Sequence, residues 1–289
     1  HNCLVGSEMC IRDRSYILKI NLLLVSVCCP YEAKLLKYIM KNLLSENAAI
    51  LIIGNEILSG RTEDKNFNYI AKKLSEHGIS ISESRTVSDN KEEIISALND
   101  LRKKFKYVFT TGGIGPTHDD VTAESVAQAF DVELEVNNEA FKILEGYYKK
   151  IGSEFNLVRQ RMARIPKSAK LIENKISAAP GFNIENVFVF AGIPKVMHAM
   201  LDITLEKIDK KDSIIKANIQ VDAPEGEIAQ ILEKILRVWT DISIGSYPFY
   251  NSDDDYGVKV EISSLNQDQL KKATNDLKKQ LSKESIKYK

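Results

Sequence analysis

Glycines, a proline and two adjacent aspartates crowd into one short stretch, TTGGIGPTHDDVTAES at residues 110–125. Gly112, Gly113 and Gly115 have no Cβ, so their backbone can adopt positive φ and lie close to a ligand. An apolar, strand-like run precedes the stretch and a helical pattern follows it, so free amides at that helix start point back at the loop. The pattern favours an anion site, best suited to phosphate. The glycine spacing matches neither a Walker loop nor a dinucleotide fingerprint.

The adjacent Asp119 and Asp120 add negative charge beside the expected phosphate. A divalent cation that bridges carboxylate and phosphate oxygens removes this repulsion, so we expect a metal at Asp119 and Asp120. Mg²⁺ is the expected ion, with Mn²⁺ or Co²⁺ as alternatives. In a second interpretation Asp120 only completes a capping box with Thr117, and both acids favour the helix N-terminus.

Composition bounds the class of protein. The chain has 289 residues, 44% of them hydrophobic, and 40 basic residues balance 40 acidic ones. Zero net charge does not favour nucleic acid as a partner. All four cysteines lie in the first tenth of the chain, so the remainder holds no disulfide or thiolate metal site, which fits a reducing, cytoplasmic setting.

The first residues read differently from the rest. An apolar run at 22–27 is short for a membrane span, and we expect no membrane association. The segment GSEMCIRDR resembles translated adapter sequence, so we interpret residues 1–39 as a non-native or disordered leader and Met40 as the native start.

Strand-like and helix-like patterns then alternate, which predicts a mostly parallel sheet covered by helices on both faces. The predicted strands are 48–53, 79–87, 107–110, 170–173 and 187–190. The predicted helices are 66–77, 91–105, 121–130, 139–151, 155–163 and 195–208. Gly54 and Gly112 both follow strands, at the sheet edge where ligands of such folds bind, so their loops are expected to converge.

The pattern changes at about Ser213 to strand, helix, strand, strand, helix. This order predicts a small α+β unit resembling a ferredoxin-like sandwich. We therefore divide the chain into residues 1–39, an α/β domain at 40–210, and an α+β domain at 211–289.

The motif TGGIGPTHDDVTAESVA resembles the signature of the MoaB/Mog-type molybdopterin-binding domain, in the form found in competence/damage-inducible protein A (CinA). Further segments resemble the same family in the same order. They are IIGNEILSGRTEDKN (52–66), VSDN (87–90), ISAAPGF (176–182) and FAGIPKVM (190–197). The resemblance implies a three-layer α/β/α sandwich that binds a pterin or nucleotide phosphate, and relatives that are commonly homo-oligomers.

The resemblance also implies site residues. It assigns catalytic roles to Asp120, Asp89 and Glu56. The implied ligand-binding residues are Gly112, Gly113, Gly115, Thr117, Thr122, Asn66, Pro180, Gly181, Gly192 and Pro194. Val196, Asn55 and Ser177 depart from the family pattern.

Several of these residues have plainer interpretations. Asp89 can cap the helix that starts near Lys91, Glu56 can be a solvated loop acid, and the proline–glycine pairs are ordinary turn residues. We expect His118 to be solvated, and His77, His198, Trp239 and Tyr247 to be structural. The run RQRMAR (159–164) can meet a phosphate, but we interpret it as a solvated helix face.

The resemblance leaves three functions open. The first is metal-dependent hydrolysis of a nucleotide pyrophosphate such as ADP-ribose or FAD. The second is binding or adenylation of molybdopterin in molybdenum-cofactor biosynthesis, and the third is a non-catalytic ligand-binding module. No segment resembles the deamidase domain of longer CinA proteins, so nicotinamide-nucleotide deamidation is not implied. The segment IGSYP (244–248) is instead similar to the region that follows the related domain in FAD-synthase-type proteins.

Overall fold

A computed structural model describes residues 47–210, 213–252 and 255–289. The interpretation of residues 1–39 falls outside these ranges. The described residues form an α/β domain (47–210) and a C-terminal unit (within 213–289). In the described part of the chain, no helix has the length and apolar content needed to cross a membrane.

The α/β domain is built on a six-stranded sheet of order β2-β1-β3-β8-β7-β6. Its strands are β1 Asn47–Ile53, β2 Ser80–Val87, β3 Tyr107–Thr111, β6 Lys170–Ile172, β7 Gly181–Ile184 and β8 Val187–Phe190. The strands β2, β1, β3 and β8 run parallel, while β7 and β6 are antiparallel to their neighbours. The predicted mostly parallel sheet is confirmed. Strand β7 was not predicted, because its residues belong to a segment that reads as a turn.

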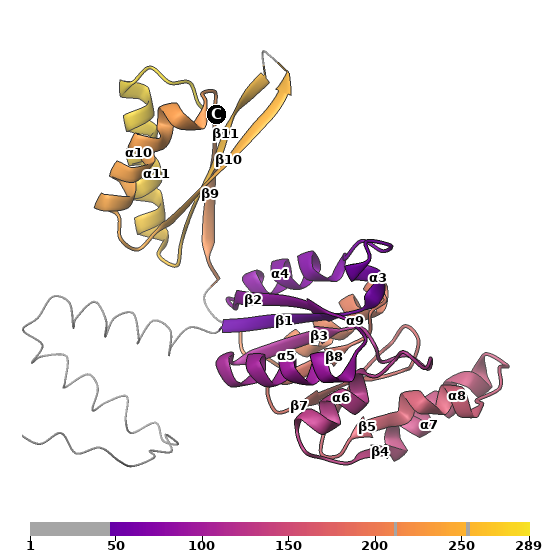
Figure 1. Ribbon diagram of the computed structural model, residues 1–289. Helices are drawn as coiled ribbons and strands as arrows, with labels where there is room; N and C mark the ends of the chain where they lie inside the picture. The colour runs from indigo at the N-terminus through magenta and orange to yellow at the C-terminus, as the bar shows by residue number, and fades with distance from the viewer. Residues whose placement is uncertain (1–46, 211–212, 253–254) are drawn as a thin grey trace, which may run out of the picture. The chain divides into compact units, whose positions relative to one another are not determined.

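Helices cover both faces of this sheet and complete three layers (Figure 1). On one face lie α4 (Asn66–Glu76) and α9 (Pro194–Leu205), which pack on Ala48, Ile50 and Ile52 of β1. On the other lie α5 (Lys91–Lys104) and α6 (Thr122–Ala129), over the alternate residues of the same strand. Because β1 is buried on both sides, its sequence is continuously apolar, as expected for a central parallel strand.

A small lobe extends from the α/β domain. It contains α7 (Asn138–Lys150), a short α8 (Leu157–Gln160), the 3₁₀ turn η2 (Arg161–Ala163) and an antiparallel pair of short strands. The strands of this pair are β4 Leu134–Val136 and β5 Arg164–Pro166.

The predicted helix at 155–163 is confirmed only in part, because α8 and η2 together cover 157–163 but the helix starts two residues late and tightens into a 3₁₀ turn at Arg161. The Asn156 side chain accepts a hydrogen bond from the Arg159 amide at 3.1 Å and starts α8 late. Pairing of β5 with β4 then draws the following residues out of the helix.

The C-terminal unit has the predicted order of strand, helix, strand, strand, helix (Figure 1). The elements are β9 Ile215–Val221, α10 Glu225–Val238, β10 Ser243–Ser252, β11 Asp255–Ser264 and α11 Gln267–Lys283. The sheet order is β10-β11-β9, and Tyr288 bridges to Val221 on the free side of β9. The small additional α+β domain expected from the sequence is present, with a core in which both helices pack on the sheet.

Candidate phosphate site

The glycine loop, residues 112–120, leaves the sheet at the end of β3. Gly112 donates a hydrogen bond from its amide to the Phe190 carbonyl at 3.1 Å, and its φ is 105°. A Cβ at this position would lie 2.1 Å from the carbonyl oxygen of Ile53 on the neighbouring strand β1. Only glycine can therefore occupy this position without moving the backbone. The loops after β1 and β3 converge as predicted.

The first turn of α6 anchors the glycine loop. The Thr122 amide donates to the Gly113 carbonyl at 3.0 Å, and its hydroxyl donates to the Gly112 carbonyl at 2.9 Å. No side chain caps α6. The amides of Gly113, Ile114 and Gly115 donate to no residue in the described ranges. Three successive amide protons beside an uncapped helix start form a concavity suited to an anion.

Asp120 lies against this row of amides. Its Oδ2 accepts hydrogen bonds from the Thr117 amide at 2.7 Å and from the Thr117 hydroxyl at 2.5 Å. A Cβ on Gly115 would be 2.6 Å from the same oxygen. Because α6 begins only at Thr122, the Thr117–Asp120 pair closes a turn of its own before the helix. The capping-box interpretation of Thr117 and Asp120 is therefore wrong.

Asp119 and His118 project to solvent at the outer end of the glycine loop. The pKa of the Asp119 carboxyl is lowered, first by the nearby Thr117 hydroxyl, then by its own backbone amide and by the charges of His118 and Arg161. The Thr117 hydroxyl has one proton and serves one carboxylate at a time, and the 2.5 Å contact favours Asp120. The His118 side chain is 97% exposed, as expected for a solvated histidine.

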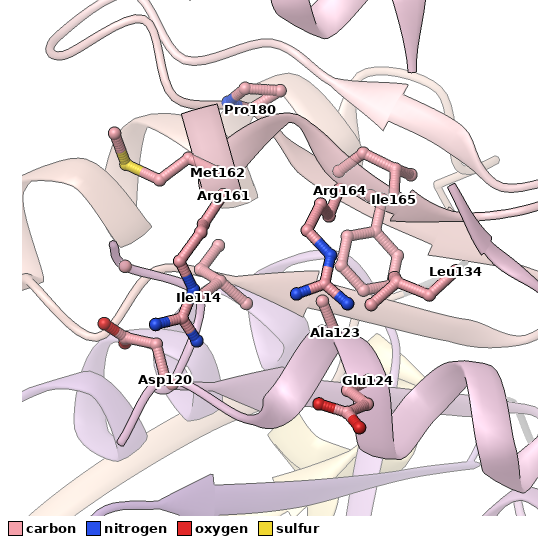
Figure 2. A pocket seen from close by; sticks show the side chains of 13 residues that line it. Ile114, Asp120, Ala123, Glu124, Leu134, Arg161, Met162, Arg164, Ile165 and Pro180 are labelled. Atoms are coloured by element: carbon pink, nitrogen blue, oxygen red, sulfur yellow. The ribbon is translucent and has the colours of Figure 1, made fainter. Parts of the chain in front are cut away.

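A narrow cleft lies between the glycine loop and the segment 161–165, which we call the arginine wall (Figure 2). Gly113, Gly115 and Asp120 line one side, and Arg161 and Arg164 line the other. The enclosed volume is about 30 Å³, the space of one or two water molecules. The cleft therefore accepts a small group, while the bulk of a nucleotide or pterin would lie outside.

The interpretation of residues 159–164 as a solvated helix face is wrong for Arg161 and Arg164. Both are half-buried and line the cleft, because the helix tightens into η2 at Arg161 and the chain enters β5 at Arg164. The close spacing of basic residues in RQRMAR was the only signal for them in the sequence. Arg159 lies outside the cleft, where its guanidinium is over the Tyr148 ring, 4.5 Å from the centroid.

Glu56 and Asp89 lie together on neighbouring loops but do not line this cleft. Asp89 Oδ2 accepts a hydrogen bond from the Asn55 amide at 2.8 Å, at the start of the four-residue helix α3 (Asn55–Leu58). The Glu56 carboxylate folds back over Gly54, where a Cβ would be 2.7 Å from it. Asn90, and not Asp89, caps α5. The capping alternative for Asp89 is thus wrong for that helix.

The remaining predicted residues support the glycine loop from behind. The buried Asn66 donates from Nδ2 to the Gly192 carbonyl at 2.8 Å. A Cβ on Gly192 would lie 3.3 Å from the Gly112 Cα, so the two loops touch. Pro194 occupies the first turn of α9. Pro180 lines the cleft, whereas Gly181 is buried in β7 against the Val189 carbonyl.

The donor atoms suit a divalent cation that is shared with a ligand. Among the described residues, no three histidine, cysteine or acidic side chains cluster as a metal site. Asp120 Oδ1 accepts no hydrogen bond from any of them, and the Asp119 carboxylate is exposed nearby. Mg²⁺ is typically held by one or two carboxylates together with substrate phosphate and water. The two aspartates fit that arrangement once a phosphate is bound.

Comparison with known proteins identifies two families along this chain. Residues 49–211 match a family described as "Probable molybdopterin binding domain", and residues 213–289 match one described as "FAD synthase, middle domain". A protein of Pyrococcus furiosus is 34% identical over 246 residues, covering 80% of this chain and 95% of its own length. A CinA-like protein of Citrifermentans bemidjiense is 39% identical over 161 residues, covering 54% of this chain and 39% of its own.

A solved structure shares this fold. The crystal structure of the protein CinA, of unknown function, from Thermoplasma acidophilum is 34% identical and has a TM-score of 0.52. The match covers 56% of this chain and 97% of that one.

Proposed function

Because this chain belongs to the MoaB/Mog-type molybdopterin-binding domain family, close to the N-terminal domain of CinA, we propose that its glycine loop binds the phosphate of a nucleotide. We further propose that it hydrolyses a nucleotide pyrophosphate of the ADP-ribose or FAD type, with a divalent cation. The observation that carries this proposal is the row of unpartnered amides at Gly113, Ile114 and Gly115.

These amides suit the charge that develops during phosphoryl transfer. A water oxygen bonds to one phosphorus, and the bond from that phosphorus to the bridging oxygen breaks. The products are AMP and the other phosphate monoester of the substrate, and the water's protons pass to solvent. Fixed amide donors stabilise charge on the non-bridging oxygens in that transition state. Thr122 holds the loop in this conformation through its two hydrogen bonds to the carbonyls of Gly112 and Gly113.

Asp119 and Asp120 would hold the divalent cation, Mg²⁺ first, with Mn²⁺ or Co²⁺ as alternatives. When bound, the ion would neutralise phosphate charge and polarise the attacking water. Thr117 would orient Asp120 through the two hydrogen bonds that it donates to Oδ2. The other Asp120 oxygen is then left to face the ligand.

Glu56 and Asp89 have a supporting role in this proposal. Their side chains shape the first loop, which lies behind Gly112 and outside the cleft. Assembly into a homo-oligomer stays a prediction, which light scattering on the purified full chain tests.

The test incubates the full chain with ADP-ribose and, separately, with FAD, with and without Mg²⁺, Mn²⁺ or Co²⁺. We expect AMP only when a metal is present, and we expect Asp120→Asn to lower the rate by roughly 10- to 100-fold or more. Asp100→Asn is the matched control, because it removes an exposed carboxylate on α5 that pairs with Arg85 of β2 at 3.1 Å. AMP formation that is unaffected by Asp120→Asn would remove Asp120 from the mechanism.

Molybdopterin binding or adenylation is the second candidate, and the family match at residues 49–211 favours it. Binding of molybdopterin with no turnover of ADP-ribose or FAD would support this candidate. Ligand binding without turnover, unaffected by metal, would instead support a non-catalytic module.

A further inference from the structure

We propose that Arg161 and Arg164 are phosphate-binding residues, and that they make the cleft selective for a diphosphate over a monophosphate. The inference rests on the proposed function, because it places the ligand's phosphate at the glycine loop. The two arginines would bind the phosphoryl oxygens that the loop amides leave exposed.

Rigid backbone positions both arginines. Arg161 begins η2 and Arg164 begins β5, where Arg164 pairs with Val136 of β4. Between and beside them, Ala163 is fully buried and Ile165 is 3% exposed. Arg161 and Arg164 stand on either side of the buried Ala163, and both side chains enter the cleft (Figure 2).

Neither guanidinium forms a hydrogen bond or an ion pair within the ranges that the structure describes, although the charge of Arg161 acts on the exposed Asp119. The half-buried arginines elsewhere in the domain are satisfied. Arg85 pairs with Glu83 at 2.7 Å, and Arg102 donates to the Ala129 carbonyl at 2.9 Å. A half-buried cation without a partner loses hydration and gains nothing in return, which is typical of a binding group without its ligand.

The acids opposite these arginines are already engaged. Asp120 accepts two hydrogen bonds from Thr117, and Glu124 forms an ion pair with Lys91 at 2.7 Å. Figure 2 shows Arg161 pointing toward Asp120 and Arg164 pointing toward Glu124, yet neither pair is within ion-pair distance. An anion can therefore enter between each arginine and the acid that it faces.

The arrangement suits two linked phosphoryl groups. A guanidinium binds phosphate oxygens in pairs through its fork of donors. Arg161 lies beside the glycine loop, whereas Arg164 lies farther along the cleft, beside Ala123 and Glu124 of α6. Because the cleft itself holds only a small group, one phosphoryl group would enter it at the loop amides and contact Arg161. The second, joined through a bridging oxygen, would contact Arg164 without entering the cleft fully.

The experiment measures equilibrium binding of inorganic pyrophosphate and inorganic phosphate to the full chain by calorimetry, with chelator present and no divalent metal. We expect pyrophosphate to bind more tightly than phosphate. Each of Arg161→Gln and Arg164→Gln should weaken pyrophosphate binding by roughly 10- to 100-fold, as for loss of a charged hydrogen bond. Arg164→Gln should leave phosphate binding within about threefold of the unaltered chain.

Arg159→Gln is the matched control, because it removes a cation from the adjacent helix but outside the cleft. Thermal unfolding of each variant establishes that it is folded. Absence of pyrophosphate binding to the unaltered chain, or unchanged binding in both variants, would overturn the inference. Equal losses for phosphate and pyrophosphate in Arg164→Gln would overturn the assignment of two phosphoryl groups.

This readout separates the inference from the proposed function. Metal-free binding that depends on both arginines supports the inference even if the chain hydrolyses neither ADP-ribose nor FAD. Conversely, hydrolysis with an unchanged KM in both variants would overturn the inference and leave the proposed function intact.

Discussion

The glycine loop and the arginine wall line the same cleft, but different interactions hold them in place. Close contacts hold the glycine loop, since a Cβ at Gly112 would overlap the Ile53 carbonyl and one at Gly113 would lie 2.2 Å from the Thr122 hydroxyl. The arginine wall is held by strand pairing and by its buried neighbours, and its guanidinium groups form no hydrogen bond or ion pair in the described protein.

Because of this difference, substitutions in the glycine loop should change stability, and substitutions in the arginine wall should change ligand binding. Residues of the glycine loop that face the sheet are needed for folding as well as for the site. The guanidinium groups of the arginine wall lose no hydrogen bond or ion pair that the structure describes when they are removed, so we expect their substitution to affect binding more than stability. Substitutions on the two walls should therefore differ in what they change, and the following predictions run from the largest expected effect to the smallest.

Gly112→Ala should destabilise the α/β domain by about 3 kcal/mol or more. The new Cβ would lie 2.1 Å from a backbone oxygen and φ is 105°, so both overlap and strain oppose it. Chemical denaturation measures the change. Gly146→Ala in α7, where a Cβ meets nothing within 4 Å, is the control, and it should stabilise the protein by up to about 1 kcal/mol. Equal effects of the two substitutions would show that the loop tolerates side chains.

Thr122→Val should cost about 1–2 kcal/mol, because it leaves the buried Gly112 carbonyl without the hydroxyl that donates to it at 2.9 Å. Phosphate binding should weaken as well, since the amides of the glycine loop lose their anchor. Thr122→Ser keeps the hydroxyl and should retain most of both properties. A fully stable Thr122→Val variant would mean that this hydrogen bond does not hold the loop.

His198 lies on α9 and does not line the cleft. A pH effect on this residue therefore changes stability without involving either wall of the cleft. Its ring stacks on Tyr69 at 3.6 Å between centroids, and its buried Nε2 has no hydrogen-bond partner among the described residues. Burial lowers the pKa of His198, Asp202 nearby opposes that shift, and Lys73 adds to it.

The unfolded chain, with a histidine pKa of about 6.5, then binds the proton more readily than the folded one. The contribution of His198 to stability should be constant above that pH and should decrease as the pH falls below it. Unfolding in urea at neutral and mildly acid pH should show this loss, and His198→Phe, which keeps the stacked ring, should reduce it. If the pH profile of His198→Phe is unchanged, another group is responsible.

Arg161→Gln and Arg164→Gln should change stability least, by no more than about 0.5 kcal/mol in either direction, because neither side chain has a partner to lose. Thermal unfolding without ligand measures this, with Arg85→Gln as a comparison that removes two ion pairs. A large loss of stability in either cleft variant would assign that arginine a structural role and would contradict the contrast between the walls.

Some features of this protein followed from its sequence alone. Continuous apolar runs predicted strands buried on both faces, and the glycines directly after β3 predicted backbone in positive φ close to a ligand. Gly112 at 105° and Gly113 at 66° have the expected positive φ. These features depend on residues close together in the chain, where backbone sterics and hydrophobic periodicity act directly.

Other features depended on contacts between distant segments. Asn156 delays the start of α8, and the β4–β5 pairing follows the 3₁₀ turn η2 directly, which brings Arg161 and Arg164 to the cleft. In the same way, Asp89 contacts the first loop instead of the helix that follows it, 34 residues away from its partner Asn55. A charged side chain has no local preference that encodes its direction. Only the packing of the backbone that carries it decides whether it meets solvent, a neighbour or a ligand.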